Sequence, residues 1–143
     1  MRIIVDADAC PSLREIERIA SHNQIPLFFY FDTAHQITST YATCIQCDTG
    51  FQSVDMCLVN AIQKEDIIIT QDYGVAGIAL SKSAFVLHPK GMIYTEENMD
   101  TLFLERYLHQ KERKIGHGKG PKKRTLEDEN RLLKNLMLLI EEG

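Results

Sequence analysis

Four aspartates in the first half of the chain are spaced so that folding could bring their carboxylates together. Asp6 directly follows a short apolar run, and Asp8 lies two residues further on. Asp72 comes shortly after a run of three isoleucines, and Asp55 falls in the first turn of a predicted helix. Carboxylates that are brought together repel one another, so their pKa values rise unless a cation neutralises them. The pattern therefore indicates a site for a cation.

The chemistry of this site would be that of a hard divalent ion. Carboxylate oxygens at this density suit Mg²⁺ or Mn²⁺, which keep part of their water shell and bridge to phosphate groups. One or two such ions can activate a water molecule and stabilise the charge that develops on a phosphodiester. Each aspartate taken alone has a structural alternative, since aspartates often form turns at strand ends or cap helices. The convergence of all four favours the metal site.

A basic strip follows in the last third of the chain. Residues 111–124 contain seven lysines and arginines and one acid, so the segment carries +6 although the whole chain carries −4. Such a strip beside an acidic body suggests a polyanionic partner, whereas the alternative is a solvated linker. Glycines next to a helix N-terminus let the backbone approach a phosphate closely. The candidate substrate-binding residues are Lys119, Lys122, Lys123 and Arg124.

Apolar periodicity predicts the elements that must position these residues. Strands and helices alternate along the chain, which predicts an α/β fold with a mainly parallel sheet covered on both faces. In such sheets ligands bind at the carboxyl ends of the strands, near a topological switch point. Strands are expected at 2–5, 27–31, 41–47, 66–70, 84–87 and 92–94, and helices at 13–23, 53–61, 75–80, 95–111 and from 125 onwards.

The C-terminal segment is expected to belong to the same domain. Thr125 and Asp128 form a predicted capping box, and the helix that follows carries an apolar stripe too large to remain in water. This stripe should dock on the domain or, less favourably, on a second copy of the chain. We therefore expect an α/β domain over residues 1–113, with a basic glycine-rich loop and an amphipathic helix over 114–143 packed on it.

Length and composition agree with one globular domain. The chain has 143 residues, of which 44% are apolar and 25% charged, an ordinary balance for a folded protein. Its apolar runs are only a few residues long, which excludes a transmembrane helix. No secretion signal is recognisable, so we expect a cytoplasmic protein whose four cysteines are reduced thiols.

Several short segments resemble the signatures of a known bacterial family. In order along the chain they are Val-Asp-Ala-Asp-Ala-Cys-Pro (5–11), Thr-Gln-Asp-Tyr-Gly (70–74), His-Pro-Lys-Gly (88–91), Tyr-Thr-Glu-Glu-Asn (94–98) and Gly-Pro-Lys (120–122). The same order is found in the uncharacterised YaiI/YqxD family, and the resemblance covers nearly the whole chain. That family is usually grouped with PIN-like nuclease domains.

The resemblance implies a three-layer α/β/α fold and an acidic cluster that binds divalent metal and hydrolyses phosphodiesters, with RNA the favoured substrate by analogy. It assigns Asp6, Asp55 and Asp72 as metal ligands and catalytic acids. Asp8 is a fourth candidate catalytic residue, a role that rests on its proximity to Asp6. One departure is Gln52, which stands where relatives often carry an acid and leaves the site one possible ligand poorer.

Two other functions are compatible with parts of the pattern. A non-catalytic nucleic-acid- or protein-binding module of the same fold would also use the basic strip. A haloacid-dehalogenase-type phosphatase would use Asp6 as nucleophile and Asp8 as acid/base, but that class also needs a motif-borne lysine and a later acidic pair. The segment around Asp72 contains a single acid. The metal-dependent nuclease is therefore the favoured hypothesis.

Overall fold

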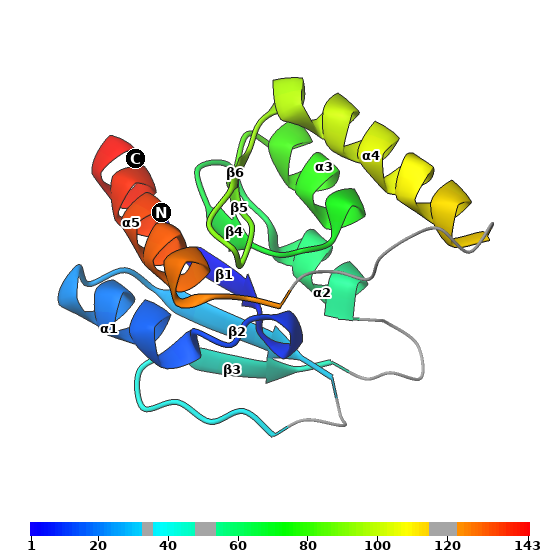
Figure 1. Cartoon of the computed structure of the whole chain (residues 1–143). Coiled ribbons are helices and arrows are strands. Elements are labelled where there is room, and N and C mark those ends of the chain that lie inside the picture. The colour runs from blue at the N-terminus through cyan, green and yellow to red at the C-terminus, as the bar shows by residue number, and fades with distance from the viewer. Residues whose placement is uncertain (33–35, 48–53, 115–122) are drawn as a thin grey trace.

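The computed structural model describes residues 1–32, 36–47, 54–114 and 123–143. Its centre is a six-stranded sheet with the order β3-β2-β1-β4-β5-β6 (Figure 1). The first five of these strands pair in parallel, and β6 runs antiparallel to β5 at the edge. The strands are β1 (Ile3–Asp6), β2 (Leu27–Phe31), β3 (Thr43–Gln46), β4 (Ile67–Ile69), β5 (Phe85–Leu87) and β6 (Ile93–Tyr94).

In the described segments, five α-helices form the two outer layers. They are α1 (Leu13–His22), α2 (Val54–Ala61), α3 (Tyr73–Ser81), α4 (Glu96–Lys114) and α5 (Leu126–Glu142), and a short 3₁₀ turn, η1 (Ala7–Ala9), follows β1. Among the helices of the described part of the chain, none is long and apolar enough to cross a membrane.

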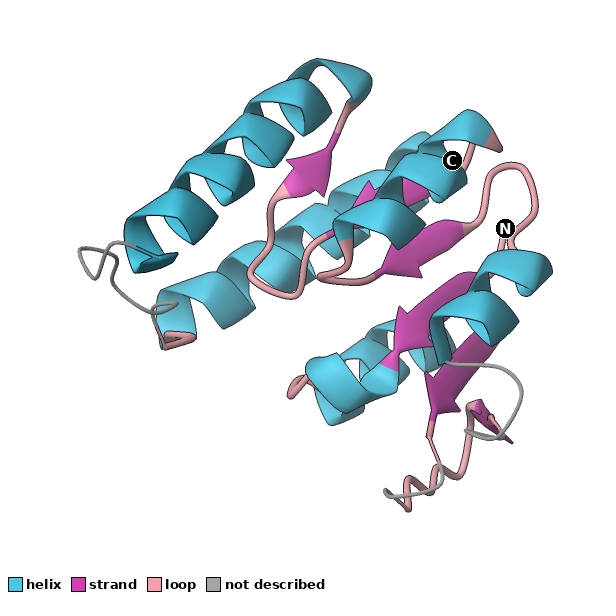
Figure 2. Ribbon diagram, turned by 90° about the vertical axis from the view of Figure 1, so that its right-hand side faces the viewer, coloured by secondary structure: helices cyan, strands magenta, loops and turns pink. Residues whose placement is uncertain are grey.

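The alternation of side chains along β1 shows which helices cover which face. Ile3 and Val5 belong to a core that also contains buried residues of α1 and α5, whereas Ile4 between them belongs to a core with α2, α3 and α4. Successive strand residues point to opposite faces, so these two cores are the two faces of one sheet. The molecule is the three-layer α/β/α sandwich that the sequence predicts (Figures 1 and 2).

The central strands read as continuous apolar runs because both of their faces are covered. Every residue of β1 and β4 is buried. A parallel sheet must be joined by crossover connections, and the helices that provide them cover its faces. This explains why Ile67, Ile68 and Ile69 follow one another without a polar residue between them.

The C-terminal helix completes one face of the sheet. Its capping box is present: the Thr125 hydroxyl accepts from the Asp128 N–H, and the Asp128 carboxylate accepts from the Thr125 N–H. Three leucines of its apolar stripe are buried in the core that contains β1, β4 and α1, namely Leu132, Leu136 and Leu139. The helix therefore docks within its own chain.

Helix boundaries differ slightly from those predicted, for local reasons. α3 begins at Tyr73, one residue before Gly74, because the Asp72 side chain caps it by accepting from the Val75 N–H. α4 continues to Lys114, three residues past its expected end. Lysine and arginine are good helix formers, so the basic residues there extend the helix.

Candidate active site

The carboxyl ends of β1 and β4 mark the switch point of the sheet. From β1 the chain passes through α1 to β2 and β3 on one side, and it returns through α2 to β4 on the other side. Ligands of open α/β sheets bind at such a point, outside the carboxyl ends of the strands. Asp6 is the last residue of β1, and Asp72 lies three residues beyond β4. Both of these predicted site residues therefore stand at the expected edge.

Asp6 is a buried carboxyl group surrounded by other acids. Its residue is 8% exposed. Burial is the largest cause that raises its pKa to about 6, and the charges of Asp55, Asp8 and Asp72 raise it further. A side-chain hydrogen bond with Thr70 acts in the opposite direction. The four predicted carboxylates thus interact electrostatically at one edge of the sheet.

Asp72 is oriented by the first turn of α3. Its Oδ1 accepts a hydrogen bond from the Val75 N–H at 3.0 Å, and its own N–H donates to Thr70 Oγ1 at 3.1 Å. A Cβ atom on Gly74 would lie 3.1 Å from the same Oδ1, so glycine leaves this oxygen room. The positive end of the helix dipole also favours a carboxylate at this place. Asp72 thus has both the structural role of a cap and a charge at the site.

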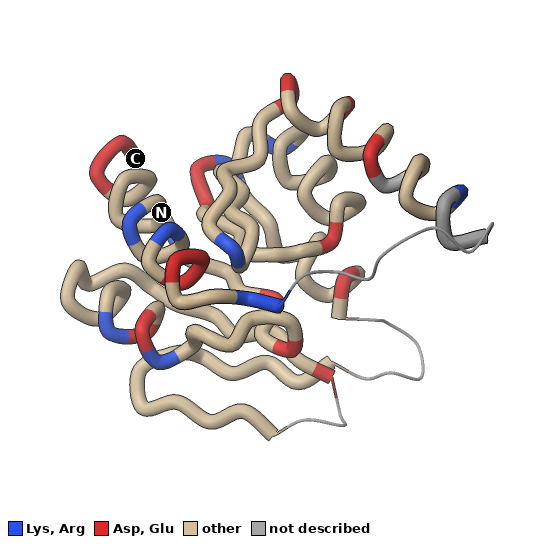
Figure 3. The backbone as a smooth tube through the Cα atoms, in the orientation of Figure 1, with Lys and Arg blue, Asp and Glu red and all other residues tan. Residues whose placement is uncertain are grey.

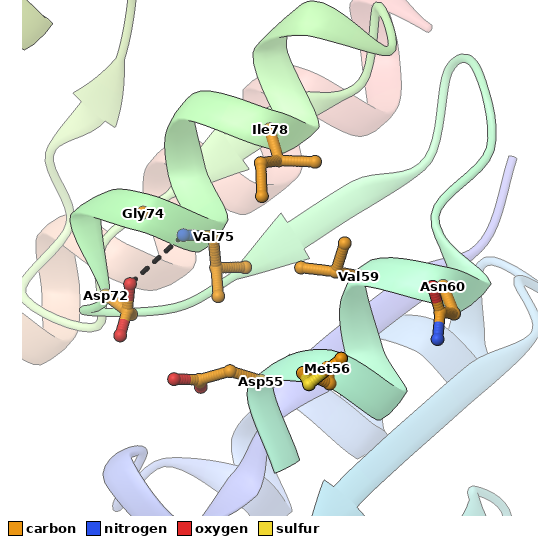
Figure 4. A pocket seen from close by; sticks show the side chains of 8 residues that line it. All are labelled: Asp55, Met56, Val59, Asn60, Asp72, Gly74, Val75 and Ile78. Atoms are coloured by element: carbon orange, nitrogen blue, oxygen red, sulfur yellow. Dashed lines mark hydrogen bonds between the residues drawn. The ribbon is translucent and has the colours of Figure 1, made fainter. Parts of the chain in front are cut away.

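Asp55 lies on α2 and faces Asp72 at the start of α3. It lies in the first turn of α2, and its carboxyl group points toward that of Asp72 (Figure 4). Burial raises the pKa of Asp55, and the nearby Asp72 raises it further through its charge and through a side-chain hydrogen bond. The two neighbouring carboxyls are therefore a place where a cation could offset the repulsion between their charges.

Asp8 has a second role as a link between two loops. It lies in η1, and its Oδ2 accepts a hydrogen bond from the backbone N–H of Asp32 at 3.0 Å. This bond ties the turn after β1 to the residue after β2. The charge of Asp8 nevertheless contributes to the raised pKa of Asp6.

An open groove of about 330 Å³ runs from the Asp55–Asp72 pair between α2 and α3. The carboxylates stand at one end, and Asn60 lies at the other (Figure 4). The sequence does not predict this groove, because helical periodicity alone cannot separate groove residues from core residues. Its remaining lining is mostly apolar and comes from Met56, Val59, Gly74, Val75 and Ile78.

Asp55 and Asp72 are residues that could hold a magnesium-like ion with few protein ligands. Within the described residues, no three histidine, cysteine, aspartate or glutamate side chains are placed so that they could hold a metal ion together. Mg²⁺ does not need such a cage, since it commonly binds one or two carboxylates and completes its shell with water and substrate phosphate. The adjacent carboxyls of Asp55 and Asp72 meet that requirement, and the charge of Asp6 acts on the same place.

Two of the four predicted substrate-binding residues, Lys123 and Arg124, lie within the described part of the chain. Lys119 and Lys122 lie outside the described residues, as does Gln52. Lys123 is exposed at the start of the last described segment. Arg124 is tied into the fold: its Nη2 donates to Ser12 Oγ at 2.6 Å and its Nε donates to the Pro89 carbonyl at 3.1 Å.

The start of the last described segment nevertheless carries basic residues close to acidic ones (Figure 3). Burial is the main reason that the pKa of the Cys10 thiol rises to about 11, but the nearby charges also contribute. Arg124 lowers this pKa and Asp6 raises it, so both charges act on the same thiol. The end of the basic strip is thus close to the turn that follows β1.

Comparison with known proteins shows the family of this chain. The family model of the uncharacterised YaiI/YqxD family matches residues 4–142. The chain belongs to this family. A UPF0178 protein of Clostridium kluyveri is 50% identical over 144 residues, covering 100% of this chain and 95% of the relative. A UPF0178 protein of Clostridium tetani is 47% identical over 142 residues, covering 98% of this chain and 97% of the relative. No solved structure matches the chain.

Two of the YaiI/YqxD motif segments meet at the switch point. Residues 5–11 contain the end of β1 and η1, whereas residues 70–74 form the junction between β4 and α3. These segments carry Asp6, Asp8 and Asp72. The family motifs therefore coincide with the acidic edge of the sheet.

Proposed function

We propose that this member of the YaiI/YqxD family is a divalent-metal-dependent nuclease that hydrolyses phosphodiesters, with RNA as its substrate. The observation that carries the proposal is the position of Asp6. This carboxyl is buried at the switch point, and burial together with three further carboxylates raises its pKa to about 6. Such a concentration of negative charge is unfavourable for folding and is expected where a cation binds.

Mg²⁺ or Mn²⁺ would be held by Asp55 and Asp72, and Asp6 would act on the ion through its charge. Bound there, the ion would supply an activated water and a positive charge next to the scissile phosphate. The hydrogen bond from the Val75 N–H keeps one Asp72 oxygen directed at α3 and presents the carboxylate in a single orientation. The proposal thus needs only two carboxylates in direct contact with the metal.

The mouth of the groove gives access to the carboxylates, and the basic strip would bring the strand to them. A bare polyanion is repelled by four carboxylates, so binding requires positive charge nearby. Arg124 and Lys123 begin the last described segment, and Arg124 lies near the turn after Asp6. Reversing the charges of Lys122 and Lys123 should reduce the log–log salt slope of single-strand binding by about 0.7 for each phosphate that is no longer neutralised.

A non-catalytic binding module of the same fold is the alternative that an experiment must distinguish from a nuclease. The phosphatase alternative is disfavoured, because that class needs a later acidic pair and the segment around Asp72 contains a single acid. Binding does not distinguish a module from a nuclease, but metal-dependent turnover does.

The test is incubation of the purified protein with end-labelled RNA and single-stranded DNA of mixed sequence, in Mn²⁺, Mg²⁺ or chelator. We expect cleavage that requires the metal and that falls at least ~100-fold in Asp55→Asn and Asp72→Asn. The amide oxygen introduced by Asp72→Asn can still accept from the Val75 N–H, so the cap survives while the charge is removed. Glu141→Gln, an exposed acid at the end of α5, is the control. Binding without cleavage under every condition would favour the non-catalytic module.

A further inference from the structure

The α4 helix packs on the domain through one face only. Met99 is buried on this face and Leu102 is partly buried, both in the core that contains α3. The helix starts at a reciprocal cap, in which the Thr95 N–H donates to Asn98 Oδ1 at 2.9 Å and the Asn98 N–H donates to Thr95 Oγ1 at 3.1 Å. From there α4 runs along the outside of the molecule (Figures 1 and 2).

The opposite face of α4 is apolar at its centre. Leu104 is 58% exposed, Tyr107 52% and Leu108 48%. Their spacing of three and four residues places them on one stripe of the helix, and 3.6 residues per turn place that stripe opposite Met99 and Leu102. Contiguous exposed apolar residues on a soluble domain commonly mark an interaction site.

The same stripe is acidic at its start and basic at its end. Glu97 and Asp100 precede the apolar centre at helical spacing, and Lys111 follows it. Lys111 Nζ lies 4.9 Å from the centroid of the Tyr107 ring, so the cation borders the apolar centre directly. Figure 3 shows acidic residues at the start of α4 and a basic residue towards its end. The charge gradient suits the helix dipole, but the dipole does not account for the apolar residues between the charges.

This order of charges makes the stripe complementary to itself in the antiparallel direction. A two-fold axis between positions 105 and 106 places Leu104 opposite Tyr107 of the second copy. The same axis brings Asp100 to Lys111 of that copy. One patch then pairs with itself, as in an isologous dimer. A parallel arrangement would instead place acids against acids.

We propose that α4 is a dimerisation helix that pairs antiparallel with α4 of a second copy of this chain. This inference does not depend on the proposed nuclease activity, because the stripe contains none of the site residues. One helix of 19 residues is about 28 Å long, so a single helix pair forms a small interface. We therefore expect a reversible dimer with a dissociation constant in the micromolar range, about 1–100 µM.

Sedimentation of the full chain across that concentration range gives the first test. The parent should pass from monomer to dimer, whereas Leu104→Glu should remain monomeric up to the highest concentration. Leu126→Glu is the matched control, since Leu126 is a more exposed leucine at the start of α5. A parent that is monomeric throughout overturns the proposal. In that event, loss of RNA binding in Leu104→Glu would assign the face to nucleic acid.

A charge exchange tests the register. Asp100→Lys and Lys111→Asp should each weaken self-association about tenfold or more, because each places like charges opposite one another twice in the dimer. A mixture of the two variants should restore association, since both contacts then join opposite charges. The two positions are about 16 Å apart along one helix, which excludes rescue within a copy. Failure of the mixture to associate better than either variant would overturn this pairing.

Discussion

The carboxyl group of Asp55 points toward that of Asp72, although α2 and α3 belong to separate parts of the chain. Asp72 is held by its helix, and Asp55 meets it across the end of the groove. The proximity of Asp72 raises the pKa of Asp55, so ionisation of Asp55 is less favourable. A divalent cation between them would remove that penalty.

Metal binding should therefore stabilise the protein. A ligand that binds only the folded state at about 100 times its dissociation constant adds about 2.7 kcal/mol to the free energy of unfolding. We expect Mn²⁺ or Mg²⁺ to raise the melting temperature of the parent and of Glu141→Gln, as followed by differential scanning fluorimetry. Asp55→Asn and Asp72→Asn should not show this increase. Equal increases in all four proteins would place the metal elsewhere.

The stability of the metal-free protein should depend on the protonation of Asp6. Its pKa in the folded state, about 6, lies above its ordinary value of 3.8, so folding favours the protonated form. The resulting stability is fully present below about pH 4 and is lost as the pH rises through about 6. The difference corresponds to about 3 kcal/mol at most.

Asp6→Asn should accordingly be more stable than the parent at a pH of about 7.5 in chelator, and this advantage should shrink at a pH of about 5. The amide keeps nearly the volume of the carboxyl but carries no charge to bury. Denaturant unfolding at both pH values measures the difference in unfolding free energy. A difference that stays constant between them would contradict the prediction.

Gly91 should tolerate no side chain. Its φ is +99°, and a Cβ there would lie 2.6 Å from Arg131 Cβ on α5. Gly91→Ala combines backbone strain with a clash, which we expect to cost about 2–4 kcal/mol of unfolding free energy. Gly77→Ala is the matched control inside α3. A Cβ there meets only Met99 Cε at 3.8 Å, so this change should be neutral or stabilise by up to about 1 kcal/mol. Similar losses of stability in both variants, measured by chemical denaturation, would show that the clash at Gly91 is relieved.

Two leucines of α5 should differ sharply in their contribution to stability. Leu136 is 0% exposed within the core, whereas Leu138 on the same helix is 42% exposed. Leu136→Ala should cost about 2–5 kcal/mol because it leaves a cavity. Leu138→Ala keeps helix propensity and should change stability by about 0.5 kcal/mol or less. Chemical denaturation of both variants checks the docking of α5, and a small effect of Leu136→Ala would mean that the helix is not firmly packed.

Much of the local structure followed from the sequence because its causes are local. The isoleucine run of β4 predicted a strand buried on both faces, and the capping box at Thr125 predicted the start of α5. The placement of Asp6 and Asp72 at strand ends also followed from short segments, since the chain direction in a parallel sheet sends those ends to one edge. The position of Asp55 in the first turn of a predicted helix grouped it with them, and the resemblance to the YaiI/YqxD family assigned it as a metal ligand.

Only the tertiary structure decided which surfaces meet. The groove exists because α2 and α3 lie side by side, which neither helix encodes in its own periodicity. Arg124, a candidate for binding phosphate, is held by hydrogen bonds to Ser12 and the Pro89 carbonyl, two partners far from it in the chain. The pairing of strands and the docking of helices depend on burial summed over distant residues. For this reason the sequence could indicate which carboxylates gather, but the packing of α2 against α3 decided that Asp55 and Asp72 face each other.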